Sequence, residues 1–94
     1  MYKVFFLLII INTVVFSNNS KIHLEYNKAE ELYENKKYKD AYVILKKVFL
    51  DDLTNIDINF SLAKTASKLK KYGIAQAAYE RILILDPSNS QARF

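Results

Sequence analysis

The sequence repeats its pattern of small and apolar residues at an interval of 34 residues. The pairs that coincide under this shift are Ala29 with Ala63, Leu32 with Ala66, Ala41 with Ala75, Leu45 with Tyr79, and Val48 with Ile82. A fixed period of this length is typical of helical hairpins that stack side by side, because each hairpin covers the apolar face of its neighbour. We therefore predict an all-α chain that contains two stacked antiparallel helix-turn-helix hairpins.

Apolar residues at three- and four-residue steps place the individual helices. The ranges that follow this spacing are 22–34, 38–50 and 56–70, followed by a fourth helix that ends at Leu85. Pro87 ends the last of them, since proline lacks the backbone donor that a helix needs and disfavours a helical residue before it. One Gly and one Pro in 94 residues argue against a turn-rich β architecture.

Local signals suggest how the helices begin and how the hairpins turn. Asn19 or Ser20 is expected to cap the first helix. Thr54, with Asp57 three residues later, resembles a capping box for the third helix. The stretch 71–73 contains the single glycine and is expected to form the turn of the second hairpin.

Alanines at matched places predict where the helices cross. Ala29 and Ala41 in the first hairpin correspond to Ala63 and Ala75 in the second, and a larger side chain at a close crossing would push the backbones apart. The other residues expected on the apolar faces of the first three helices are Leu24, Tyr26, Leu32, Tyr33, Tyr42, Leu45, Val48, Phe49, Ile58, Leu62, Ala66 and Leu69.

The first 17 residues have the organisation of a secretory signal peptide. Lys3 supplies a positive charge, residues 4–16 are mostly apolar, and Ser17 is a small residue suited to cleavage. Asn12 interrupts the apolar run, which is shorter than the roughly 20 apolar residues that span a bilayer as a helix. We predict an exported chain, periplasmic or secreted, with an uncleaved inner-membrane anchor as the alternative.

Composition argues against several classes of function. The chain has no cysteine, one histidine and no Gly-rich loop, so we expect no catalytic, metal-binding or cofactor-binding residues. Fourteen Lys+Arg against ten Asp+Glu give a net charge of +4, with acids among the lysines, which does not favour a nucleic-acid partner. We expect His23 to be solvated or partly packed, and Glu30, Glu31 and Glu34 to form a solvated face.

Two lysine clusters recur at equivalent places. Lys36, Lys37 and Lys39 flank the first intra-hairpin turn, and Lys68, Lys70 and Lys71 flank the second. Stacked hairpins would bring these clusters along one edge. The edge either serves solubility alone or attracts anionic headgroups or an acidic partner, over a range that physiological salt limits to about 8 Å.

The stretch Tyr72-Gly73-Ile74-Ala75-Gln76-Ala77-Ala78-Tyr79, the closing Asp86-Pro87 and the 34-residue register resemble the tetratricopeptide repeat (TPR) family. The resemblance covers residues 22–89, although Leu53 stands where the family usually has proline. It divides the chain into a signal peptide (1–17), a linker (18–21), two repeats (22–55 and 56–89) and the start of a third repeat or a cap (90–94).

The resemblance also implies a binding surface. In this family the first helix of each pair lines a concave groove that holds a peptide or helix. The positions that correspond here are His23, Tyr26, Glu30, Tyr33 and Glu34 from the first repeat, and Asp57, Phe60, Lys64, Ser67 and Lys68 from the second. Aromatic rings among charges of both signs suit the binding of an amphipathic segment. The alternative is that the rings of Tyr26, Tyr33 and Phe60 simply pack between helices. The Lys-and-Asn clamp that some members use for a terminal carboxylate is absent.

The expected function is that of a non-catalytic protein–protein interaction scaffold in the cell envelope. Within the family, the stretches Ile58–Ala63 and Tyr79–Pro87 are similar to the periplasmic repeats that precede certain bacterial outer-membrane β-barrels. The alternative is therefore the N-terminal part of a larger membrane-linked assembly or transport protein. Asn89 is expected to cap the helix that begins the incomplete third repeat. Ile82, Leu83 and Leu85 form an apolar face that we expect further repeats or self-association to cover.

Overall fold

The computed structural model describes residues 20–92, and within this range the chain is helical and contains no strand. One helix occupies residues 20–34. It is followed by α2 (Tyr38–Asp51), α3 (Ile56–Lys68), α4 (Tyr72–Leu85) and the short 3₁₀-helix η1 (Ser90–Ala92). The predicted all-α class is confirmed for this part of the chain. The predicted signal peptide and its cleavage point after Ser17 lie outside the described residues.

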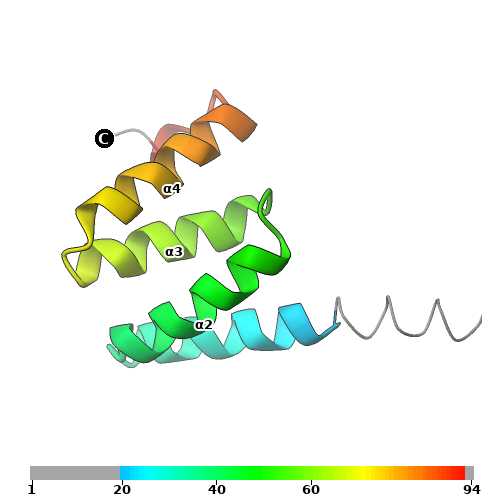
Figure 1. Ribbon diagram of the computed structural model, residues 1–94, viewed down its shortest axis with the longest axis vertical. Helices are drawn as coiled ribbons and strands as arrows, with labels where there is room; N and C mark the ends of the chain where they lie inside the picture. The colour runs from blue at the N-terminus through cyan, green and yellow to red at the C-terminus, as the bar shows by residue number, and fades with distance from the viewer. Residues whose placement is uncertain (1–19, 93–94) are drawn as a thin grey trace, which may run out of the picture.

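Successive helices run in opposite directions, and α3 lies between α2 and α4 (Figure 1). α3 contacts both neighbours, and η1 returns to contact α4. The packing is therefore repeat-like, since each helix is covered mainly by those next to it in the sequence.

The core confirms the expected role of the alanines. Ala29, Ala41 and Ala63 are completely buried, and Ala75 is almost completely buried. Around them lies a cluster of larger apolar residues: Tyr42, Leu45, Val48, Ile58 and Leu62. The alternation of small and large side chains lets the helices approach closely without leaving voids.

Two expectations about apolar residues differ from the structure. Leu24 is 68% exposed, and Ile22, two residues before it, packs against the core instead. Ile82 is fully buried, although it was expected on an uncovered face. Near it, η1 contacts α4 and buries Ala92, so this face of α4 is partly covered within the chain.

The two intra-hairpin turns have the same backbone structure. Lys36 and Lys70, which are 34 positions apart, have φ angles of 61° and 62°. In the first turn, Lys37 N–H donates to the Leu32 carbonyl at 2.8 Å, and in the second, Lys71 N–H donates to Ala66 at 2.8 Å. This is the Schellman arrangement that ends a helix, with lysine at the left-handed position that glycine usually occupies. The third helix therefore ends at Lys68 rather than Lys70.

The predicted turn at residues 71–73 is wrong. Gly73 is the second residue of α4, and its φ is not positive. The left-handed residue that reverses the chain is Lys70. The left-handed backbone conformation is unfavourable for lysine and easy for glycine, so the sequence placed the turn at the nearby glycine instead.

The predicted capping box is also wrong, because the N-cap of α3 is Asn55. Its Oδ1 accepts from the Ile58 N–H at 3.1 Å, which leaves Thr54 outside the helix. Ser20 is already helical, so it does not cap the first helix, and Asn19 lies outside the described residues. The cap at Asn89 is confirmed, since its Oδ1 accepts from the N–H groups of Gln91 and Ala92.

Replacing the left-handed lysines by glycine is expected to stabilise the protein. An L-residue in this conformation carries a steric cost of about 1–2 kcal/mol that glycine avoids, offset in part by the greater freedom of glycine in the unfolded chain. We expect Lys36→Gly or Lys70→Gly to raise the free energy of unfolding by about 0.5–1 kcal/mol each, as measured by urea denaturation. Lys39→Gly, inside α2, is the matched control, and the expected change is a loss of similar size. Equal losses in all three variants would contradict the assignment of strain to the turns.

A buried polar network connects the segment before α3 with α4. Asn59 is completely buried, and its Nδ2 donates to the carbonyls of Leu53 at 3.0 Å and Asn55 at 2.9 Å. Its Oδ1 accepts from Arg81 at 2.9 Å, and the Arg81 guanidinium lies 4.6 Å from the centroid of the Phe49 ring. One asparagine side chain thus joins the segment before α3 to α4. Among residues 20–92 no buried side-chain nitrogen or oxygen lacks a partner.

Candidate partner-binding groove

The eight residues expected in the groove come from two helices and differ in exposure. Residues 20–34 supply His23, Tyr26, Glu30 and Tyr33, and α3 supplies Asp57, Phe60, Lys64 and Lys68. His23, Asp57 and Lys68 are exposed, whereas the other five are half-buried. The surface therefore combines three accessible polar groups with a more enclosed floor.

Two contacts join the helices across this surface. The Tyr26 hydroxyl and the Ser61 Oγ form a hydrogen bond of 3.1 Å. One helical turn further along, the Lys64 Nζ lies 5.0 Å from the centroid of the Tyr33 ring and 5.1 Å from that of Phe60. The ammonium group is thus within cation–π range of one ring from each helix. The structure brings Tyr33, Phe60 and Lys64 together, while Ser61, which the sequence did not indicate, provides the second connection.

The aromatic floor extends to two rings that sequence reasoning did not assign to it. Tyr33 and Tyr38 meet edge to face with centroids 5.2 Å apart, and Phe60 and Tyr79 do so at 6.1 Å. The Lys68 Nζ lies 6.0 Å from the Tyr38 centroid. The rings therefore do pack between helices, as the alternative interpretation held, and they also carry lysine head groups above their faces. The 34-residue register could not reveal these pairs, because each joins helices that the repeat does not relate.

The opposite end of the surface contains an acidic pocket of about 290 Å³. Its lining residues are Ile22, His23, Tyr26, Asp52, Asn55, Asp57 and Ile58. The Asp52 carboxylate accepts from the Asn55 Nδ2 at 3.1 Å, which fixes it beside the N-terminus of α3. His23 and Asp57 thus line one pocket together with Asp52.

The surface is acidic near the start of α3, at Asp57, and basic near its end, at Lys64 and Lys68. Asp57 and Lys64 are seven residues apart, which corresponds to about two turns or roughly 10 Å. Within residues 20–92 the ion pair found at 4.0 Å or less joins Lys47 and Glu25, at 3.1 Å. The carboxylate of Asp57 and the ammonium groups of Lys64 and Lys68 are therefore not neutralised by ion pairs inside the described chain, and they remain available to a ligand.

Burial raises the pKa of two tyrosines in the floor. The pKa of Tyr26 lies above its ordinary value of 10.0, first because of burial and then because of the nearby carboxylates of Glu30 and Asp57, while the Ser61 hydrogen bond opposes the shift. The pKa of Tyr33 is also raised, mainly by burial, with smaller effects from Tyr38 and Glu34. Both hydroxyls stay protonated at neutral pH.

The raised pKa of Tyr26 predicts a specific loss of stability in alkali. Because the folded state holds the proton more tightly, this contribution is complete below the unfolded pKa of 10.0 and is lost as the pH rises through the folded pKa. Near pH 8 we expect Tyr26→Phe to be less stable by about 0.5–1.5 kcal/mol, because the Ser61 bond is lost. As the pH rises to about 11, the difference between wild type and variant should shrink, since the variant has no Tyr26 proton to lose. Urea unfolding midpoints of the two proteins measure this difference, and a constant difference would contradict the prediction.

The part of the chain that the structure describes lacks a metal-binding cluster and a membrane-spanning helix. Residues 20–92 contain no group of three or more His, Asp or Glu side chains placed to hold a metal ion. No helix among them is long and apolar enough to cross a membrane. A scan against models of known protein families finds no match, and a search of curated proteins finds no relative. The class that the structure defines is therefore an all-α protein with repeat-like helix packing.

Proposed function

We propose that this protein is a TPR-type scaffold that binds a segment of a partner protein on the surface formed by residues 20–34 and α3. The observation that carries the proposal is the position of Lys64, whose half-buried ammonium lies over the Tyr33 and Phe60 rings and forms no ion pair within residues 20–92. A cation held on an aromatic floor suits a carboxylate flanked by apolar side chains. The 34-residue register and the burial of all four matched alanines support the repeat interpretation.

The charges specify the partner segment further. A basic side chain of the partner would enter the pocket beside Asp52 and Asp57, and an acidic one would reach Lys64 or Lys68. The distance of roughly 10 Å corresponds to about three residues of an extended segment or seven of a helix. The proposed partner is therefore a segment with a basic and an acidic residue at such a spacing.

The proposed repeats occupy residues 22–55 and 56–89, and a third begins at 90–94. We also propose that the protein acts after export, in the periplasm or outside the cell. The basic start and apolar run of residues 1–17 support export. Mass spectrometry of the mature amino terminus tests this proposal. Cleavage after Ser17 would support it, and an intact terminus would favour the anchored alternative.

Site-specific photocrosslinking in cells tests the surface. A crosslinking amino acid is placed at exposed groove positions, His23 and Lys68, and at the exposed position Val43 of α2 as a matched control. We expect a discrete adduct from His23 and Lys68 but not from Val43. Lys64→Met, which keeps the apolar stem and removes the charge, should abolish the adduct while leaving the fold intact. Equal adducts from Val43, or adducts that Lys64→Met does not change, would contradict the proposal.

A further inference from the structure

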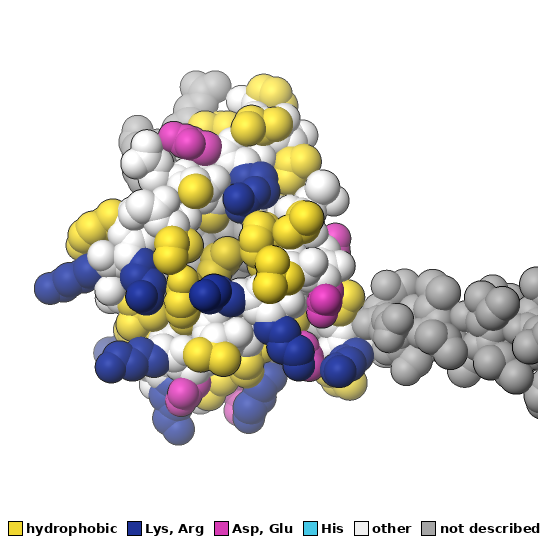
Figure 2. All heavy atoms as spheres, in the orientation of Figure 1, with side chains coloured by type: hydrophobic (Ala, Val, Ile, Leu, Met, Phe, Trp, Pro, Cys, Tyr) yellow, Lys and Arg dark blue, Asp and Glu magenta, His cyan; other side chains and the backbone are white. Residues whose placement is uncertain are grey.

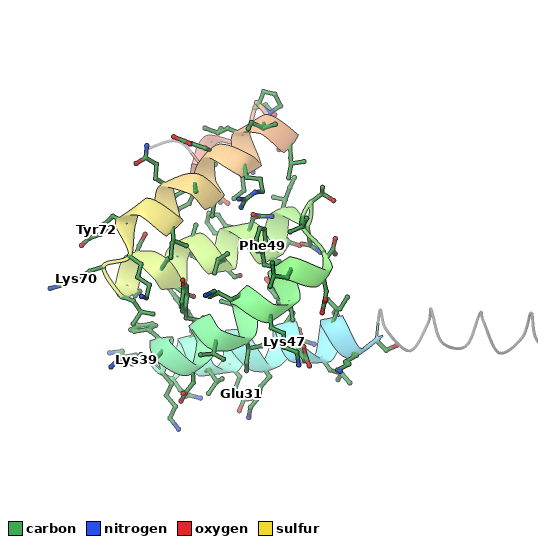
Figure 3. The ribbon with its side chains drawn as sticks, in the orientation of Figure 1. Glu31, Lys39, Lys47, Phe49, Lys70 and Tyr72 are labelled. Carbon is green, nitrogen blue, oxygen red and sulfur yellow. The ribbon has the colours of Figure 1, made fainter. Side chains whose placement is uncertain are left out.

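The two intra-hairpin turns lie together at one end of the molecule. A shallow pocket of about 450 Å³ is lined by Lys36, Lys37, Tyr38, Lys39 and Asp40 from the first turn and by Leu69 from the second. Lys39, Lys70 and Tyr72 project from this end (Figure 3). Several Lys and Arg side chains lie at this end, and others are spread over the rest of the face in view (Figure 2). The lysine tip is defined as Lys36, Lys37, Lys39, Lys68, Lys70 and Lys71, of which Lys68 also borders the groove.

The lysine tip carries a concentrated and uncompensated charge. It contains six of the chain's 14 Lys+Arg residues, all exposed, and the acids nearest in sequence are Glu34 and Asp40. None of the six forms an ion pair within the described chain. Lys71 lies 5.4 Å from the centroid of the Tyr42 ring, a neutral partner that leaves its charge in place. A single-sign field of this kind attracts an extended anionic surface.

Lysine occupies the same strained backbone position in both turns. Lys36 and Lys70 occupy equivalent left-handed positions, with φ angles of 61° and 62°. Glycine would fit both positions without steric strain. An unfavourable residue at the same place in two turns points to a role for its side chain, because strain that persists is found preferentially at functional positions.

Apolar groups beside the charges distinguish a membrane from an acidic protein segment. Tyr72 is 64% exposed and Ile74 is 40% exposed, directly after Lys70 and Lys71. Tyrosine rings next to lysines suit the headgroup level of a bilayer, where one end of the ring is apolar and the other is hydrated. The tip is formed by the projecting ends of helices, so it meets a flat surface more readily than it encloses a peptide (Figure 3).

We propose that the lysine tip docks on a bilayer that contains anionic phospholipids. The lysines contact headgroup phosphates, and Tyr72 and Ile74 lie among the headgroups. This contact shares Lys68 with the groove, but the docking proposal does not depend on the proposed partner binding.

A tryptophan reporter tests the docking directly. The chain contains no tryptophan, so Tyr72→Trp places a single fluorophore at the tip of the full-length protein. With phosphatidylcholine vesicles containing phosphatidylglycerol, we expect the Y72W emission to shift to shorter wavelengths and to be quenched by brominated lipid. Phosphatidylcholine alone should give neither effect, and added salt should weaken both. The reporter reads the tip itself, so membrane contact through residues 4–16 does not by itself produce the signal.

Charge removal identifies the lysines responsible. Lys36→Gly with Lys70→Gly, in the Y72W background, removes two tip charges without straining the turns. Each lysine near an anionic surface multiplies the binding affinity by a similar factor. Removing two lysines should therefore lower the affinity for the anionic vesicles about 10- to 30-fold. The matched control, Lys21→Gln with Lys28→Gln, removes the same charge from the helix at 20–34, and the affinity should change by less than about threefold. Lys64→Met, in the groove, should leave docking unchanged.

Three outcomes would overturn the proposal. The Y72W emission could respond equally to neutral and anionic vesicles, or both double variants could weaken docking equally. A response to soluble polyglutamate but not to anionic vesicles would assign the tip to an acidic protein segment instead. If the groove gave no crosslinks while the tip still docked on anionic vesicles, the proposed partner site would be wrong and the docking proposal would stand.

Discussion

Replacing Asn59 by leucine is expected to lower the free energy of unfolding by about 3–4 kcal/mol, a large part of what a small domain has. Asn59 is completely buried and makes three hydrogen bonds, two to carbonyls at the inter-repeat connection and one to Arg81. Leucine has a similar volume but leaves both carbonyls and the guanidinium without these partners. Removing one partner of a buried polar group costs the desolvation of the group that remains, and more when that group is charged.

Urea denaturation followed by circular dichroism measures this loss. The matched control is Asn27→Leu, at an exposed position of the helix at 20–34, where we expect a change within about 0.5 kcal/mol. Arg81→Met, alone and combined with Asn59→Leu, completes a double-mutant cycle, and we expect a coupling above about 1 kcal/mol between the two sites. A loss below about 1 kcal/mol for Asn59→Leu would show that the network does not hold the segment before α3 to α4.

Enlarging Ala63 to leucine is expected to destabilise the protein by about 2–3 kcal/mol. Ala63 is completely buried in the middle of α3, a helix that lies between α2 and α4 (Figure 1), so we expect no room there for three additional carbon atoms. The helices would have to separate, which would also move the adjacent Lys64 relative to the Tyr33 ring. We therefore expect lower stability together with weaker groove crosslinking.

The control for this change is Ala77→Leu, at an exposed position of α4. The substitution is chemically identical but meets solvent, so the free energy of unfolding should change by less than about 0.5 kcal/mol. Thermal and urea unfolding of both variants give the comparison. Similar effects at Ala63 and Ala77 would mean that close helix crossing does not explain the repeated alanines.

The sequence could indicate the helices because each depends on its own residues. Apolar spacing gave the start of α2 at Tyr38 and the end of α4 at Leu85, as observed. Local signals failed where two of them competed. Asn55 and Thr54 are both good N-cap residues, and only the backbone geometry decides which one accepts from the Ile58 N–H. Gly73 attracted the turn prediction, although the hydrogen bonds of Lys71 place the turn before it.

The candidate site was predictable only in outline. The resemblance named residues from two helices, and the structure shows which of them meet, with Lys64 over the rings of Tyr33 and Phe60. Tyr38 and Tyr79 escaped notice because their ring partners lie on other helices. Asn59 gave no signal at all, since an asparagine in a helix is usually exposed and its partner Arg81 is 22 positions away.

Sequence alone determined the helical class, the 34-residue register and the alanines that must be buried, because periodicity and side-chain size act locally along a helix. Only the tertiary structure decided which polar groups are buried, which rings lie under lysine head groups and which turns share one end of the molecule. These features depend on distances between residues far apart in the chain, and those distances are set only when the helices pack.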